Sequence, residues 1–236
     1  MYSYYYMYNN PYYLIGMGLV MIGVVLMLIA QAKVKSSYSK YSKVANSRGS
    51  TGYQIARDML DNNGLRDVSI NMVKGTMTDF YNPKDRSVNL STKVYNDATI
   101  ASLAIAAHEC GHAIQHNEGY QPLVFRNTIL PVCNIGQTVG WIAVIIGLLF
   151  SNLSIAWFGV LAMSGILLFQ VVTLPVEFDA SARALEILKT RYLTTDEYGG
   201  AKKVLSAAAL TYVAAMLATL MSLLRIALLV VGSNRD

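Results

Sequence analysis

Four long apolar segments constrain what this chain can fold into. Each is close to the roughly 20 residues that an α-helix needs to cross a hydrocarbon core of about 30 Å. Only 14% of the residues are charged and the mean hydropathy is +0.37, as is typical of membrane proteins. We therefore predict four transmembrane helices, at Tyr12–Ala30, Thr128–Phe150, Leu153–Leu174 and Ser206–Gly232.

The positive charges predict how these helices are oriented. Twelve of the 19 Lys and Arg residues lie in the polar segment 33–127 and five more lie in 175–205. Four crossings put both segments on one face of the membrane and both termini on the other, and the positive-inside rule makes the basic face cytoplasmic. The excess of cations is thus explained by topology, and we expect no nucleic acid partner.

The first apolar run also has one feature of a signal peptide. Ala30-Gln31-Ala32 has the form of a cleavage site, but no Lys or Arg precedes the run. We therefore expect an uncleaved anchor, preceded by a Tyr-rich stretch that suits the membrane interface.

The motif His108-Glu109-Cys110-Gly111-His112 is the chemical signature of the chain. The Ala-rich sequence before it and Gly119 after it predict a helix of about 20 residues, capped by Asn96 or Asp97. Such an apolar helix is buried, and buried His and Glu side chains are costly unless they are paired or bound to a metal.

The spacing of the motif assigns roles to its side chains. Residues four apart share a helix face, so His108 and His112 can bind one Zn²⁺ about 2.0–2.1 Å from each. Glu109 is offset by about 100° and can reach a water on the metal as a general base. Cys110 points away from the pair and is expected to pack in the core. His116 lies four residues further along the same face. It is interpreted as an orienting group, as a substrate contact or simply as a polar residue at the end of the helix.

A catalytic zinc needs a third protein ligand. The carboxylates downstream are Glu118, Glu177, Glu186 and Glu197. The two central apolar segments form a hairpin that returns the chain, just before Glu177, to the side of the membrane on which the helix of the His108–His112 motif lies. This topology favours Glu177 as the third ligand. Pro175 suits the first turn of a new helix reaching Leu188.

The region before the motif predicts a small sheet. Strands are expected at Val68–Val73, Thr76–Tyr81 and Ser87–Leu90, with a helix at Thr51–Asn62 that ends near Gly64. The strand at Ser87–Leu90 is interpreted either as an ordinary sheet strand or as the edge on which an extended peptide pairs.

The motif and the sequence Glu177-Phe178-Asp179-Ala180-Ser181-Ala182-Arg183-Ala184 resemble the YugP-type neutral zinc metallopeptidases of bacterial membranes. The resemblance extends to residues 79–83 and 88–91, and a more distant one joins the chain to the HtpX and CAAX prenyl protease gluzincins. It implies that the third ligand is the Glu of a Glu-x-x-x-Asp pattern on a second helix. Glu177 matches the Glu, but Ser181 replaces the Asp, so either Ser181 or Asp179 orients a zinc-bound His.

The resulting prediction is an α+β membrane protein with four transmembrane helices and a small gluzincin-like domain with a short sheet and the motif helix. It would be a zinc metalloendopeptidase of the bacterial inner membrane, with one Zn²⁺, its active site in the cytoplasm and both termini outside. Its partners would be a peptide or protein substrate and the bilayer. The oxyanion donor is expected among Arg183, His116 and Tyr212, although Arg183 also suits an ion pair with Asp179.

Five segments follow from this prediction. They are 1–32, the Tyr-rich N-terminus and first transmembrane helix; 33–127, the metallopeptidase region; 128–174, the transmembrane hairpin; 175–205, the third-ligand helix and linker; and 206–236, the fourth transmembrane helix and C-terminus. Two other interpretations remain, a site-two-type intramembrane protease and a non-catalytic membrane scaffold that contains zinc.

Overall fold

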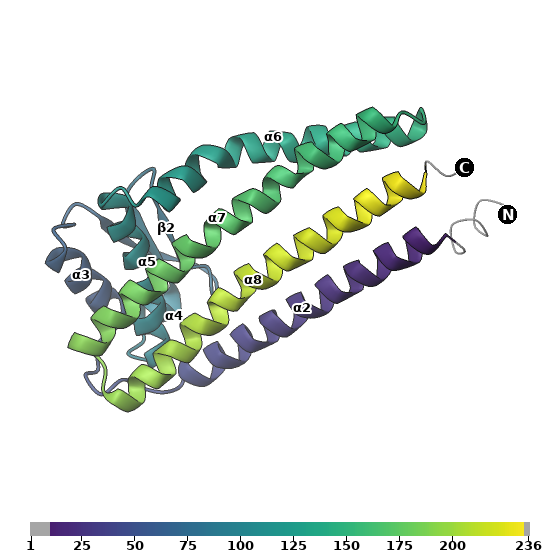
Figure 1. Cartoon of the computed structure of the whole chain (residues 1–236). Helices are drawn as coiled ribbons and strands as arrows, with labels where there is room; N and C mark the ends of the chain where they lie inside the picture. The colour runs from purple at the N-terminus through teal and green to yellow at the C-terminus, as the bar shows by residue number, and fades with distance from the viewer. Residues whose placement is uncertain (1–9, 234–236) are drawn as a thin grey trace. The chain divides into compact units, whose positions relative to one another are not determined.

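The computed structural model describes residues 10–233, so most of the Tyr-rich N-terminal stretch lies outside the described residues (Figure 1). In chain order the elements are α2 (Pro11–Tyr41), α3 (Gly52–Asn62), β1 (Ser69–Val73), β2 (Phe80–Asn82), β3 (Ser87–Ser91), α4 (Thr92–Asn96), α5 (Ile100–Asn117), α6 (Gln121–Leu149), α7 (Leu153–Arg191) and α8 (Thr195–Gly232). They form two compact units. The apolar unit comprises Met1–Ala30, Phe125–Leu174 and Thr211–Asp236, and the mixed unit comprises Gln31–Val124 and Pro175–Leu210.

The four predicted transmembrane helices are confirmed. Within the described residues α2, α6, α7 and α8 are long and apolar enough to cross a membrane. Small residues let their backbones approach closely, as is common where helices pack in lipid. On α6, a Cβ added at Gly147 would lie 2.4 Å from the Ala156 backbone nitrogen of α7, and Gly23 of α2 meets Ala218 of α8 in the same way.

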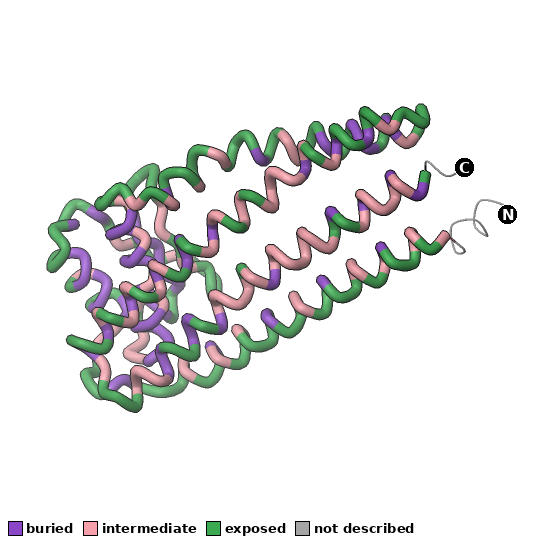
Figure 2. Tube along the Cα trace, viewed as in Figure 1, coloured by how far each residue is buried: buried purple, intermediate pink, exposed green. Residues whose placement is uncertain are grey.

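The mixed unit is built around a three-stranded sheet with the order β1-β3-β2. β3 runs parallel to β1 and antiparallel to β2, so that Val88 lies between Ile70 and Tyr81. Helices α3 and α5 supply most of the core around it, and Figure 2 shows buried residues gathered in both. Burying these side chains provides the main favourable free energy of folding for this unit. The core includes Ile55, Met59, Leu60, Val88, Leu90, Leu103, Ala107, Ala184 and Leu188.

The strand predicted at Ser87–Leu90 is confirmed as an ordinary sheet strand. Its other interpretation, as a pairing edge, is wrong, because β3 is the centre of the sheet and all five of its residues are buried. The strand expected at Thr76–Tyr81 begins only at Phe80. Gly75 and Met77 have positive φ angles of 116° and 56°, which an extended strand does not tolerate, and they turn the chain before β2.

The motif helix is confirmed, but it begins later than the sequence suggests. Its N-cap is Thr99, whose side chain accepts a hydrogen bond from the Ser102 backbone, and not Asn96 or Asp97. Those two residues instead end α4. At the other end, Gly119 adopts a φ of 64°, which confirms it as the stop signal because glycine takes this conformation without steric cost.

Pro175 does not begin a new helix. It lies inside α7, which is continuous from Leu153 to Arg191. Proline is tolerated inside long helices of membrane proteins where neighbouring helices, Ser or Thr side chains or small local adjustments satisfy the backbone group that it frees. One helix therefore carries both the second half of the hairpin and Glu177.

Candidate metal centre

Three potential ligands converge in the mixed unit. His108 and His112 come from α5 and Glu177 comes from α7, and one ligand atom from each lies within 4.8 Å of the others. The Glu177 Oε2 atom is 3.3 Å from His108 Nε2 and 3.5 Å from His112 Nε2. The Glu177 side chain is only 3% exposed, so all three donors are largely withdrawn from water.

The donor set and its spacing fit a zinc ion. Ligands at about 2.0–2.1 Å in tetrahedral geometry lie roughly 3.3 Å from one another, close to the two nitrogen–oxygen distances observed. Two imidazoles and one Glu are also the ligands of a known class of catalytic zinc site. A neutral imidazole nitrogen and a carboxylate oxygen both present lone pairs, so a cation between them stabilises this arrangement.

Glu109 lies beside this cluster without belonging to it. Its residue is 8% exposed, and burial raises the pKa of its carboxyl above the ordinary value. The charges of His108 and His112 oppose that rise in the pKa, while Asp79 and Glu177 add to it. Glu109 is therefore electrostatically coupled to the ligands, as the offset along the helix predicts.

Cys110 is confirmed as a core residue. It is fully buried and its Sγ faces the Ala56 carbonyl oxygen at 3.6 Å, on the side of α5 that packs on α3. Burial raises the pKa of the thiol, so it stays protonated and inert.

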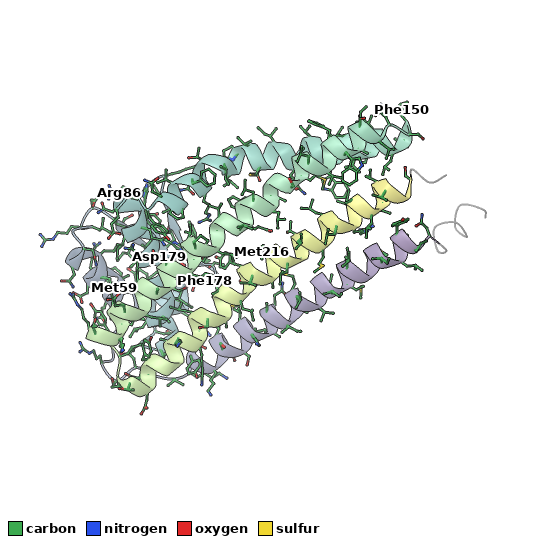
Figure 3. The ribbon with its side chains drawn as sticks, in the orientation of Figure 1. Met59, Arg86, Phe150, Phe178, Asp179 and Met216 are labelled. Carbon is green, nitrogen blue, oxygen red and sulfur yellow. The ribbon has the colours of Figure 1, made fainter. Side chains whose placement is uncertain are left out.

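Each imidazole of the cluster has a hydrogen-bond partner at its Nδ1 atom, the nitrogen that faces away from Glu177. The Ser181 Oγ atom lies 3.2 Å from His108 Nδ1. Gln115 Oε1 lies 3.0 Å from His112 Nδ1. Asp179, labelled on α7 in Figure 3, accepts a hydrogen bond from Gln115 instead. The structure therefore places Ser181, and not Asp179, against His108.

The remaining candidate residues lie in other contacts. His116 Nδ1 is 2.8 Å from the Tyr81 hydroxyl of β2. Burial raises the pKa of Tyr81, so its phenol stays protonated and can donate this bond. Arg183 forms the ion pair with Asp179 that the sequence suggested and a second one with Glu118.

The rival carboxylates are not in the ligand cluster. Glu118 is half exposed and holds Arg183, and Glu197 accepts hydrogen bonds from Thr194 and Ser47 near the start of α8. Glu186 is exposed on α7. Tyr212, the last of the oxyanion candidates, belongs to the apolar unit.

Gln115 is the residue of this site that the sequence did not reveal. It lies three residues after His112 and therefore on the same side of α5. Its complete burial is unusual for a glutamine, but the sequence shows only a polar residue near a helix end.

Comparisons with known proteins identify the family of the chain. A family model described as "Putative neutral zinc metallopeptidase" matches residues 16–231. A curated protein of Bacillus subtilis (strain 168), named "Putative membrane protease YugP", is 45% identical over 208 residues, which is 88% of this chain and 92% of that protein. No solved structure matches the chain. The family match spans nearly the whole sequence, and the chain therefore belongs to this family of neutral zinc metallopeptidases.

Proposed function

We propose that the chain is a membrane-embedded endopeptidase that hydrolyses peptide bonds at a single zinc ion. His108, His112 and Glu177 would hold the metal and Glu109 would act as the general base. The observation that carries this proposal is the convergence of three ligand atoms within 4.8 Å from two separate helices, with the coupled carboxylate of Glu109 beside them.

The residues of the site divide the chemistry among them. A bound zinc would lower the pKa of a water ligand and polarise the scissile carbonyl. Glu109 would accept the proton of the attacking water and pass it to the leaving amine. Three protein ligands would leave room for that water, as in other catalytic zinc sites and unlike closed structural ones.

An extended substrate can pair along β2. Within the described sheet β2 has a neighbouring strand on one side only. It contacts α5, the helix of the motif, through the hydrogen bond between Tyr81 and His116. Phe80 of the same strand is 47% exposed. A peptide that adds to this edge would gain backbone hydrogen bonds without depending on its sequence. The proposed pairing edge is thus β2, and not the strand at Ser87–Leu90, for which the sequence left both an ordinary strand and an edge open.

We further propose that the active site faces the cytoplasm and that both termini lie outside. The support is the concentration of Lys and Arg in segments 33–127 and 175–205, near the ends of the spans. Alkaline phosphatase fused after Asp236 should be active, and the same reporter placed after Asn63 should be inactive. The opposite pattern would reverse the topology without affecting the zinc chemistry.

The two alternatives are less well supported. A site-two-type intramembrane protease needs its motif on a spanning helix, whereas α5 packs with α3 and the sheet and is not among the four candidate spans of the described chain. A non-catalytic scaffold with structural zinc would have no use for a buried carboxylate beside the ligands, where burial is costly.

The test is Glu109→Gln, with Glu186→Gln as the matched control on the surface of α7. The purified, zinc-loaded proteins in detergent are given unfolded casein. Glu109→Gln should retain its zinc and lose at least about 100-fold in cleavage rate, because general-base catalysis contributes at least that much. The control should cleave like the unmodified protein. Equal cleavage by Glu109→Gln and the unmodified protein would refute the peptidase assignment.

A further inference from the structure

Gln115 makes three hydrogen bonds, one to His112 within α5 and two that link α5 to α7. Its Oε1 atom is 3.0 Å from His112 Nδ1, and its Nε2 atom is 2.8 Å from both the Val176 carbonyl oxygen and Asp179 Oδ2. The side chain is 0% exposed, so no water competes for these groups. All of these residues belong to the mixed unit.

The chemistry of these partners determines which way the amide of Gln115 faces. A backbone carbonyl and a carboxylate can only accept, so the atom between Val176 and Asp179 must be the NH₂ group. The opposite atom is then the oxygen, which can only accept. His112 Nδ1 must therefore carry the proton that is donated to it, and His112 Nε2 keeps a free lone pair directed at the zinc position.

Asp179 is held in place by the next contact in the chain. Its Oδ2 atom accepts a hydrogen bond at 2.6 Å from Arg183 Nε, while Arg183 Nη1 reaches Glu118 at the same distance. Arg183 thus fixes Asp179, Asp179 fixes the Gln115 amide, and the amide fixes the imidazole of His112.

We infer that Gln115 is the positioning residue of His112, holding its ring in the one tautomer and orientation that bind zinc through Nε2. This inference rests on the proposed zinc site. It assigns to a neutral amide the task that a carboxylate performs for many metal-bound histidines. Asp179 then helps to position His112 indirectly, by holding the amide of Gln115, whereas Ser181 contacts His108 directly.

The test measures metal binding separately from activity. Gln115→Met keeps the length of the side chain and removes its hydrogen bonds. Zinc affinity, measured by competition with a chelator in detergent, should fall about 10- to 100-fold, and the visible absorption spectrum of the Co²⁺-loaded protein should change. Glu186→Gln is the control, because Glu186 is exposed on α7 and lies outside this chain of hydrogen bonds, and it should alter neither measurement.

A double variant tests whether Gln115 acts by accepting a hydrogen bond from His112. In Gln115→Glu with Asp179→Asn, the new carboxylate accepts from His112 Nδ1 and the new amide donates back to it. Most of the zinc affinity and the Co²⁺ spectrum should return, although the Val176 carbonyl loses its donor and Arg183 Nε loses the Oδ2 acceptor that it shared with Gln115. A folded double variant that recovers neither property would contradict the positioning role.

Nitrogen NMR of the zinc-loaded protein tests the tautomer without any change at Gln115. The chain has only three histidines, so labelled signals can be assigned with a variant at each. His112 should bind metal through Nε2 and carry its proton on Nδ1, whereas binding through Nδ1 would overturn the inference.

The outcomes separate the inference from the proposed function. If the unmodified protein binds no zinc, both fall. If it binds zinc and Gln115→Met matches it in affinity and in Co²⁺ spectrum, only the positioning role of Gln115 is wrong. If Gln115→Met does not fold, the affinity of the double variant and the NMR tautomer still decide.

Discussion

The backbone of Gly111 touches the backbone of Ala180. A Cβ atom added at Gly111 would lie 2.7 Å from the Ala180 carbonyl oxygen, closer than real side chains come. Gly111 belongs to the HExxH motif on α5, and Ala180 lies three residues after Glu177 on α7. The missing side chain lets the two helices approach until the carboxylate of one reaches the imidazoles of the other.

Gly111→Ala should therefore disrupt the metal site as well as the packing. The new methyl group meets backbone atoms that cannot rotate away, so α7 must shift relative to α5. We expect a loss of about 1–3 kcal/mol in stability from overpacking, and a lower zinc content in the protein that folds. Gly199→Ala on α8 is the control, because nothing lies within 4 Å of its added Cβ. A Gly111→Ala variant with normal stability and zinc would show that the contact is not needed.

Removing Glu177, the proposed third ligand, should abolish tight zinc binding. Glu177→Ala leaves two imidazoles, and we expect its zinc affinity to fall by more than the roughly 10- to 100-fold that loss of an orienting group costs. Metal analysis of the purified protein after dialysis is the measurement, with Glu186→Ala, an exposed glutamate on the same helix, as the control. Stoichiometric zinc in Glu177→Ala would remove Glu177 from the ligand set.

The parts of the site that sequence could predict are those governed by local geometry. Helix periodicity alone places His108 and His112 on one face and turns Glu109 aside from them. Glu177 could be predicted as a candidate as well, because the lengths of the apolar segments determine where the chain re-emerges from the membrane. Ser181 was singled out by its place in the family pattern, and it does lie against His108.

The parts that sequence missed depend on which elements become neighbours. Alternation in a short strand indicates which residues face a core, but not which strands flank it, and the strand at 87–91 proved to be central. Gln115 looks like a surface residue until α7 covers it. Pro175 looks like a helix start because proline suits the first turn of a helix, yet it lies inside α7, which runs unbroken from Leu153 to Arg191.

Chelation should destabilise the mixed unit. A ligand that binds only the folded state adds RT ln(1 + [L]/Kd), or about 4 kcal/mol when free zinc is 1,000 times its Kd. Treatment with EDTA should therefore lower the thermal midpoint of the unmodified protein in detergent, and added zinc should restore it. Glu177→Ala should already melt at the lower temperature and should not respond to EDTA. An equal EDTA effect on both proteins would place the metal elsewhere.

The half-buried carboxylate of Asp79 should make stability depend on pH. Burial raises its pKa above the ordinary value of 3.8, although hydrogen bonds from the Ser91 backbone and hydroxyl lower it in part. The folded state then holds the proton more tightly than the unfolded state. The contribution of Asp79 to stability is present below pH 3.8, is lost as the pH rises through the folded pKa, and is constant above it.

Asp79→Asn removes this titration and retains groups that can bond to Ser91. The variant should show a flatter dependence of its thermal midpoint on pH between about 4 and 7, and the unmodified protein should lose stability relative to it as the pH rises. The Asp79 charge also contributes to the raised pKa of Glu109, which titrates in both proteins. The comparison is therefore repeated in a Glu109→Gln background. Parallel midpoint curves with and without the Asp79→Asn substitution in that background would mean that Asp79 is not protonated more readily in the folded protein than in the unfolded chain.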